Sequence, residues 1–327
     1  MATFTVLDAD ELSALASMFA LGAVLSSRAI DAGTINSNFA IETEAGRYFL
    51  RVNEGKSEAD VAWEAQLVAA LADRGVTTPK PLLAVDGRPY AALASAPGKW
   101  VSAFPWRAGG HLRAETVTPA HAREFGAALA ALHVAGLALP IEWRRTSIYD
   151  HDHLVRRFAL IERENDPMLA PAAAILREEL EVAASAADIR RAATHGIIHG
   201  DLFRDNVLWD GDRISAILDF EQASGGSLAY DVAVCLNDWC WSDRERMPRM
   251  DLATSLLAGY QQMRPLSAGD REALPYELRA SAARFTITRI TDVYLAKVPN
   301  PEKDFRAFLA RCEVWRTLAL RALTQLL

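Results

Sequence analysis

Residues 198–224 carry oxygen-bearing side chains whose types and spacing suit phosphate chemistry. His199 is followed by Asp201, then by Asn206 after four intervening residues, and Asp219 comes near the end of an apolar run. A single Asp or Asn is most often a turn residue. The joint pattern of two acids and one amide is much harder to obtain by chance, so it is the strongest functional signal in the chain.

The segments around these residues predict how they come together. NVLW and ISAILDF are strand-like runs joined by Asp210-Gly211, which is a strong hairpin signal. A hairpin returns its end to its beginning. The sequence therefore predicts that Asp219 lies beside Asn206 and Asp201, on a loop that leads into the hairpin.

Oxygen-only clusters of this kind suit Mg²⁺, a hard cation that holds triphosphates. Asn206 and Asp219 are the predicted metal ligands, and Asp201 is left to accept a proton from an attacking hydroxyl. Kinases use an Asp, an Asn after four intervening residues and a second Asp in this order. A zinc hydrolase is the weaker alternative, because His195 and His199 are not accompanied by an HExxH motif.

An upstream ion pair is predicted between Arg51 and Glu64. Arg51 ends the apolar strand GRYFLRV, and Glu64 falls in the middle of an apolar helical stripe made of Val61, Leu67, Val68 and Leu71. A buried acid needs a partner, and a cation on the adjacent strand supplies one. Such a cation can bind phosphate. The loop before this strand would cover the triphosphate with backbone N–H groups through Gly33, Asn36, Ser37 and Asn38.

The rest of the chain predicts an α+β protein with two lobes. A β-rich lobe over 1–95 is expected to bind the nucleotide, a hinge over 94–99 to contact it through Ser95, and a mostly helical lobe over 96–327 to carry catalysis and the substrate. Within these lobes we expect a helix over 9–20, strands within 22–53 interrupted by a turn or loop over 31–43, a helix from Ser57 to about Arg74, two short strands over 76–95, and mostly helices from about 119.

Composition restricts the class of protein. The chain has 327 residues, 51% of them hydrophobic, and a net charge of -7, so it can form a large core and has no general attraction for nucleic acid. The three cysteines form no CxxC pair, the first residues lack a basic leader, and no apolar run reaches membrane-spanning length. We expect a cytoplasmic protein with no membrane partner and make no prediction of its oligomeric state.

The segments HGDLFRDN, DFE at 219–221 and YDVAV at 230–234 resemble the aminoglycoside phosphotransferase and choline kinase superfamily. Further segments, among them GTINSNF, AYDVAVCLNDWCW and LRASAARFTITRITD, resemble the homoserine kinases of that superfamily, and the resemblance covers nearly the whole chain. It implies the bilobal protein-kinase-like fold, with a small antiparallel-sheet N-lobe and a larger, mostly helical C-lobe.

The resemblance also implies an activity: transfer of the ATP γ-phosphate, with Mg²⁺, to the hydroxyl of L-homoserine in threonine biosynthesis. Asp201 is then the base, Asn206 and Asp219 hold the metal, and Asp231 braces the catalytic loop. The chain departs from the superfamily pattern at Arg51, where a Lys is expected. Glu221 is a second departure from many homoserine kinases, and it would contact either the metal or the substrate.

The acceptor site should offer an acid and an Arg, since homoserine carries both an ammonium and a carboxylate. The predicted substrate-binding residues are Glu221, Asn237, Asp238, Trp239 and Arg289. Arg289 falls on the apolar stripe of its helix, so it needs an anionic partner from the protein or the substrate. Related kinases of choline, hydroxylysine, methylthioribose or aminoglycosides remain alternatives, choline through an aromatic cage at Trp239 and Trp241. A non-catalytic nucleotide-binding protein is a third.

Overall fold

The chain folds into two units. A short segment within the sequence of the second unit belongs to the first. The computed structural model describes residues 5–30, 35–164 and 166–324. The first unit runs to Gly109 and includes Ser215–Glu221, and the second contains Gly110–Ile214 and Gln222 onward. The sequence placed the division at 95. The first unit extends further because β5 (Trp100–Pro105) pairs antiparallel with β3 (Gly46–Asn53) of the same sheet.

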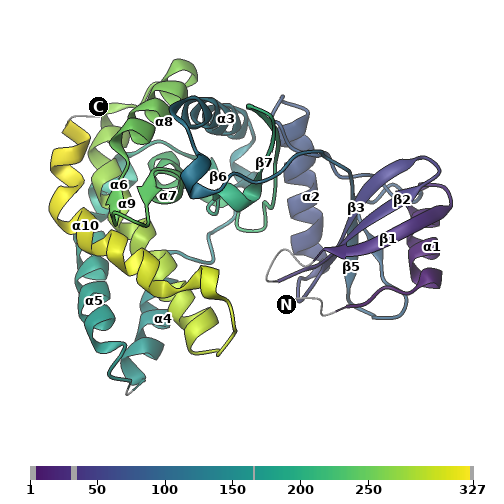
Figure 1. Ribbon diagram of the computed structural model, residues 1–327, viewed down its shortest axis with the longest axis horizontal. Coiled ribbons are helices and arrows are strands. Elements are labelled where there is room, and N and C mark those ends of the chain that lie inside the picture. The colour runs from purple at the N-terminus through teal and green to yellow at the C-terminus, as the bar shows by residue number, and fades with distance from the viewer. Residues whose placement is uncertain (1–4, 31–34, 165, 325–327) are drawn as a thin grey trace. The chain divides into compact units, whose positions relative to one another are not determined.

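A five-stranded sheet with strand order β1-β2-β3-β5-β4 forms the first unit (Figure 1). Besides β3 and β5, its elements are α1 (Ala9–Met18), β1 (Val24–Ile30), β2 (Ser37–Thr43), α2 (Glu58–Ala72) and β4 (Ala91–Ala92). Leu50 and Val52 of β3 pack into one core with Leu12 and Leu15 of α1. Alternation along the strand turns Arg51 to the opposite face, where Glu64 of α2 meets it.

Two local predictions for this unit need correction. The turn or loop expected over 31–43 ends earlier, because β2 begins at Ser37 and its apolar residues join the core; residues 31–34 lie outside the described residues. Of the two strands expected over 76–95, only β4 is formed, because Pro79 and Pro81 remove backbone donors that a strand would need. The predicted helix α2 is confirmed, and Ser57 caps it by accepting a hydrogen bond from the Asp60 backbone N–H at 3.2 Å.

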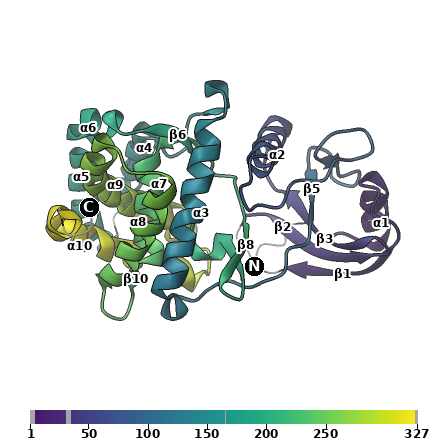
Figure 2. The ribbon, with the colours of Figure 1, turned by 90° about the horizontal axis from the view of Figure 1, so that it is seen from above.

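Helices make up most of the second unit (Figure 2). They are α3 (Pro119–Leu137), α4 (His151–Arg163), α5 (Ala170–Ser185), α6 (Ala187–Ala192), α7 (Leu228–Trp239), α8 (Met250–Met263), α9 (Ala268–Arg289) and α10 (Phe305–Thr324). The long helix α9 contacts α5, α6, α7 and α10, so it is the central helix of this unit. Helices α3 and α8 pack closely, since a Cβ on Gly126 would clash with the Leu256 carbonyl oxygen.

Short strands position the loop that carries Asp201. β6 (His195–Ile198) pairs antiparallel with β9 (Ser224–Ser227), a strand that the sequence did not predict. The predicted hairpin is confirmed as the two-stranded sheet of β7 (Val207–Asp210) and β8 (Arg213–Ile217). A second small pair joins β10 (Trp241–Ser242) to β11 (Met247–Pro248). Among the described helices, none has the length and apolar character needed to cross a bilayer.

Candidate functional site

In the first unit, a cluster of charges surrounds Arg51. We call it the Arg51 cluster; its members are Asn36, Arg51, Lys56, Glu64, Asp219 and Glu221. The predicted ion pair is confirmed, with 2.9 Å between Arg51 Nη2 and Glu64 Oε1. Burial alone would lower the pKa of Arg51, but Glu64, Glu221 and Asp219 raise it well above its usual value. Arg51 is therefore a buried, permanently charged cation aimed at two further carboxylates.

Glu221 lies within this cluster, and its carboxylate is shared among several groups. Its Oε1 lies 3.9 Å from Arg51 Nη1, its Oε2 lies 3.5 Å from Lys56 Nζ, and the Asn36 amide donates a hydrogen bond to it. Burial raises the pKa of Glu221, but Arg51 and Lys56 outweigh this effect and lower it overall. Lys56 was not singled out from the sequence, because it stands in a polar turn with no periodic pattern around it.

The loop that leads into β2 is held by backbone and side-chain bonds. Asn36 Oδ1 accepts from the Glu54 backbone N–H at 3.1 Å, and the Ser37 hydroxyl donates to Glu54 Oε1 at 2.8 Å. Asn38 is paired with Arg51 across β2 and β3. These bonds place Asn36 next to Glu221, while Gly33 lies outside the described residues.

Asp219 has an unusual backbone conformation. Its φ is 60°, in the left-handed region that non-glycine residues seldom occupy. The side chain is 45% exposed, and its Oδ1 lies 3.9 Å from Arg51 Nη1. Strained backbone of this kind concentrates at functional sites, where the surroundings hold a side chain in a required direction. The geometry therefore presents a solvent-accessible carboxylate beside a fixed cation.

The predicted catalytic residues of the second unit lie on one tight loop. The Asn206 amide donates to the Asp201 carbonyl oxygen at 2.7 Å, and the Phe203 backbone N–H donates to the same oxygen at 2.9 Å. With its NH₂ group turned toward the loop, Asn206 keeps its amide oxygen as an acceptor. Asn206 thus offers an amide oxygen on this loop, and Asp219 of the first unit offers a carboxylate oxygen; each is the kind of donor atom that Mg²⁺ prefers.

Asp231 braces this loop, as the resemblance implied. It accepts hydrogen bonds at 2.8 Å from the backbone N–H groups of both His199 and Gly200, and it contacts His133 Nε2 at 3.1 Å. Burial raises the pKa of Asp231, but these donors lower it overall. Gly200 has a φ of 77°, and a Cβ there would lie 3.1 Å from the Gln222 carbonyl oxygen, so the turn requires glycine.

One face of α7 continues this anchoring of the loop. The Trp239 indole N–H donates to the Leu202 carbonyl oxygen at 3.2 Å, and the Cys235 thiol approaches the same oxygen at 3.7 Å. Asp231, Cys235 and Trp239 are spaced four apart, so they share a helix face. Asp238 adds a 2.8 Å hydrogen bond from the Arg204 backbone N–H and a 3.2 Å ion pair with the Arg204 guanidinium.

The structure therefore corrects three of the predicted substrate residues. Trp239 is fully buried and stacks on Phe125 with ring centroids 4.0 Å apart, so it cannot meet an acceptor. Asn237 is also buried, donates to the Leu278 carbonyl and accepts a 2.6 Å hydrogen bond from the Trp315 indole. Asp238 holds Arg204. The apolar sequence of α7 correctly indicated that this segment is buried. Its buried side chains contact other parts of the protein rather than a substrate.

Two arginines of α9 differ in their contacts. Arg289 ends the helix and is followed by a π-helical turn, Ile290–Tyr294, a geometry frequent at functional sites. Its Nη1 donates at 3.1 Å to the backbone carbonyl of Asp304 rather than to a carboxylate. Arg284, which sequence reasoning missed, places Nη1 3.3 Å from Asp201 Oδ1. The sequence does mark Arg284, because it is the only charged residue in the run Ala280–Thr288.

The hinge expected over 94–99 is instead the loop that joins β4 to β5. β4 pairs with β5, and the Leu93 backbone N–H donates to the Lys99 carbonyl oxygen at 3.0 Å, so this segment closes a hairpin loop of the first unit. Ser95 is exposed on that loop. The segment joining the two units follows β5. The sequence prediction placed the hinge earlier because APGKW (96–100) interrupts the strand pattern.

Comparison with known proteins agrees with this architecture. The chain is similar to an aminoglycoside phosphotransferase from Alicyclobacillus acidocaldarius, with a TM-score of 0.70 at 14% identity over 99% of this chain and 98% of that one. A choline kinase from Cryptosporidium parvum gives a TM-score of 0.63 at 14% identity over 91% of each chain. The chain thus has the protein-kinase-like phosphotransferase fold, and the predicted α+β class is confirmed.

Sequence similarity is more specific. The pattern of the phosphotransferase enzyme family matches residues 26–266. A homoserine kinase of Mesorhizobium japonicum is 37% identical over 297 residues, covering 89% of this chain and 88% of that one, and one of Parvibaculum lavamentivorans is 34% identical over 326 residues, covering 98% and 97%. The chain belongs to the phosphotransferase enzyme family.

Proposed function

We propose that the chain is an ATP-dependent homoserine kinase, which transfers the γ-phosphoryl group to the side-chain hydroxyl of L-homoserine. The observation that carries this proposal is the similarity to homoserine kinases along almost the whole chain, together with intact Asp201, Asn206 and Asp219. The reaction supplies phosphohomoserine for threonine biosynthesis. A cytoplasmic location remains a prediction from the sequence.

The first unit would bind the triphosphate. Arg51, fixed by Glu64, would contact the α- and β-phosphates, and Asn36, Ser37 and the neighbouring residues of their loop would cover them. Asp219 and Asn206 would hold Mg²⁺, which neutralises phosphate charge when bound. Glu221 would remain beside Arg51 and Lys56, which favours a role at the phosphates or the metal over contact with the acceptor.

Asp201 would orient the acceptor hydroxyl and accept its proton as the phosphoryl group transfers. Its loop is held by the Asn206 amide and by Asp231, so little reorganisation is needed before reaction. Positioning and charge stabilisation supply most of the rate enhancement in phosphoryl transfer. The second unit therefore contributes a preset carboxylate rather than covalent chemistry.

Arg289 would bind the homoserine carboxylate. Burial lowers the pKa of Arg289, while Asp238 and Asp201 offset part of this effect. The choline alternative loses its physical basis, because Trp239 is stacked in the core and Trp241 is buried under Arg311. Neither ring forms an open cage.

The test is Mg²⁺- and ATP-dependent ADP release with L-homoserine, against choline, L-serine, methylthioribose and kanamycin. Stimulation by homoserine alone is expected. Asp201→Asn should reduce turnover by about 10³-fold while leaving ATP affinity nearly unchanged, because Asp201 acts on the hydroxyl. Asp210→Asn, on the exposed turn of the same hairpin, is the matched control. Near-normal turnover by Asp201→Asn would refute the base assignment, and a response only to another alcohol would refute the substrate.

A further inference from the structure

Arg284 is a buried cation next to the predicted base. Its side chain is only 4% exposed, and its Nη1 lies 3.3 Å from Asp201 Oδ1. The guanidinium carbon lies 3.8 Å from the ring centroid of Phe285 and 4.1 Å from that of Tyr149. Two aromatic faces and one carboxylate therefore fix the plane and the position of this group.

The surroundings of Arg284 are not those of a residue selected for stability. Its Nε is buried and has no hydrogen-bond partner among the described residues, which carries a desolvation cost. Its carboxylate partner is 31% exposed, so the ion pair is partly screened by water. Replacing such a cation by an apolar side chain of similar length is often neutral or stabilising. Burial lowers the pKa of Arg284, but Tyr230, Asp201 and Tyr149 raise it overall, so its charge is held mainly by groups at and around the predicted base.

The contacts of Asp201 show what that function would be. The backbone of Asp201 is held through its carbonyl oxygen by Asn206 and Phe203, but these bonds leave the side-chain torsions free. The Asp201 carboxylate has a polar side-chain contact with Arg284, whose Nη1 donates to Oδ1 at 3.3 Å. One carboxylate oxygen is thus occupied, and the other is directed by the planar geometry of the group.

We propose that Arg284 is a positioning residue, which holds the Asp201 carboxylate in the orientation that aligns the acceptor hydroxyl for phosphoryl transfer. The proposal rests on the assignment of Asp201 in the proposed function, but not on homoserine as the acceptor. Loss of this orientation should lower kcat for every accepted alcohol. It should leave the KM for ATP unchanged, because Arg284 belongs to the second unit and contacts the catalytic loop.

The experiment compares Arg284→Met and Arg284→Lys in the full-length protein. Each is assayed with L-homoserine and with 3-aminopropan-1-ol, which is homoserine without its carboxylate, and melting temperatures are measured in parallel. We expect Arg284→Met to lower kcat by about 10²-fold with both acceptors, the size that misplacement of a catalytic group produces. Arg284→Lys, which keeps the charge without the planar fork, should give an intermediate kcat.

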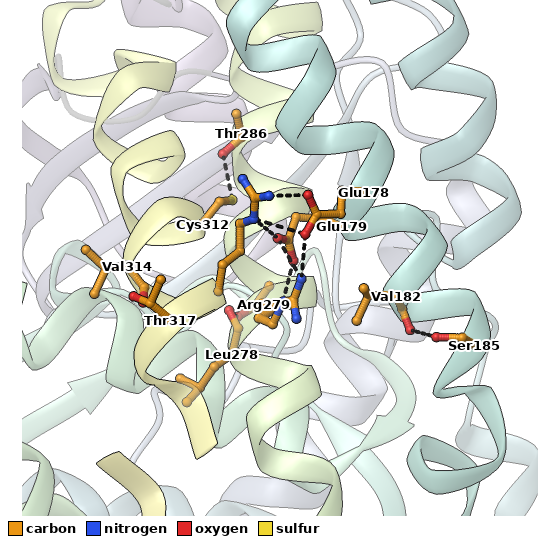
Figure 3. Close-up of polar contacts among 12 residues, drawn as sticks. Glu178, Glu179, Val182, Ser185, Leu278, Arg279, Thr286, Cys312, Val314 and Thr317 are labelled. Atoms are coloured by element: carbon orange, nitrogen blue, oxygen red, sulfur yellow. Dashed lines mark hydrogen bonds and ion pairs between the residues drawn. The ribbon is translucent and has the colours of Figure 1, made fainter. Parts of the chain in front are cut away.

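Arg279→Met is the matched control on the same helix. Figure 3 shows Arg279 of α9 against Glu178 and Glu179 of α5. Arg279 Nε lies 2.7 Å from Glu179 Oε2, and its Nη2 lies 3.0 Å from Oε1, so its partner is a buried carboxylate of α5 and not a residue of the catalytic loop. Its removal should lower the melting temperature and leave kcat unchanged. Arg284→Met should show the reverse pattern, with kcat lowered and the melting temperature unchanged or raised.

Three outcomes would overturn the proposal. A lower melting temperature with unchanged kcat for Arg284→Met would make Arg284 structural. An effect on homoserine alone, seen as a raised KM with normal turnover of 3-aminopropan-1-ol, would make it the carboxylate-binding residue. Unchanged kcat with both acceptors in Arg284→Met, at an unchanged melting temperature, would exclude any positioning role. If the wild type uses another alcohol, the same comparison is made with that alcohol, so failure of the substrate assignment is distinguished from failure of this proposal.

Discussion

Asp219 and Asp231 lie close together in the sequence, yet their carboxylates have opposite surroundings. Asp231 is fully buried, and its oxygens accept from two backbone N–H groups and contact His133. Asp219 is half exposed, in a left-handed backbone conformation, with its carboxylate 3.9 Å from a cation. A fully buried carboxylate whose oxygens accept from backbone donors maintains the fold, whereas a half-exposed carboxylate in a strained backbone conformation can be reached by a ligand.

This difference predicts separate consequences for the two residues. Substitution of Asp219 should affect ligand binding with little effect on stability, and substitution of Asp231 should mainly lower stability. The comparison fails if either residue shows the behaviour expected of the other.

The largest effect is expected for Asp219→Asn. Asn tolerates the left-handed conformation, so the backbone is kept while the charge is removed. Activity should fall by about 10³-fold or more, because the metal's charge stabilisation is worth several kcal/mol. ATP affinity measured with Mg²⁺ should fall to the value measured with excess EDTA. The melting temperature should change little, since a half-exposed ion pair contributes less than about 1 kcal/mol. Retained Mg²⁺-dependent nucleotide binding would remove Asp219 from the metal site.

Asp231→Asn should act in the opposite way. The variant turns an amide toward two backbone donors, so its free energy of unfolding should fall by about 3 kcal/mol. The lowered pKa of Asp231 adds a pH signature. A carboxyl whose pKa is depressed by folding contributes stability above about pH 4 and loses it as the pH falls further.

Urea unfolding between pH 3 and pH 7 measures both effects. The wild type should lose stability at the acid end more steeply than Asp231→Asn, because only the wild type must protonate this carboxylate. Parallel curves would show that Asp231 does not contribute to acid unfolding. Asp212→Asn, at an exposed carboxylate beside His121, is the control for a general charge effect.

How far the sequence predicted the site depends on the element that carries each residue. Arg51 and Glu64 were paired correctly, because β3 and α2 each bury one face and their periodicities of 2 and 3.6 fix where a side chain points. Asp201 and Asn206 were found through their spacing. The left-handed conformation of Asp219 follows from tertiary surroundings and has no sequence pattern.

Helices α7 and α9 show where periodicity fails. Both are buried on nearly all sides, so an angular count cannot tell which face meets the catalytic loop and which meets a substrate. Asn237 and Trp239 were therefore placed at the acceptor, and Arg284 was passed over in favour of Arg289. Ser95 was misplaced for a different reason, because the pairing of β4 with β5 is a contact between strands that local signals did not define.

The smallest expected effect tests the structural reading of α7. Trp239→Phe keeps the stack on Phe125 and removes the indole bond to the Leu202 carbonyl oxygen, so it should cost about 1 kcal/mol of unfolding free energy. The KM for the acceptor should be unchanged, since the ring reaches no solvent. Trp315→Phe removes a comparable buried indole bond, to Asn237 Oδ1, and is the matched control. A raised acceptor KM in Trp239→Phe alone, at unchanged stability, would return this tryptophan to the substrate site and weaken the assignment of α7 as a scaffold.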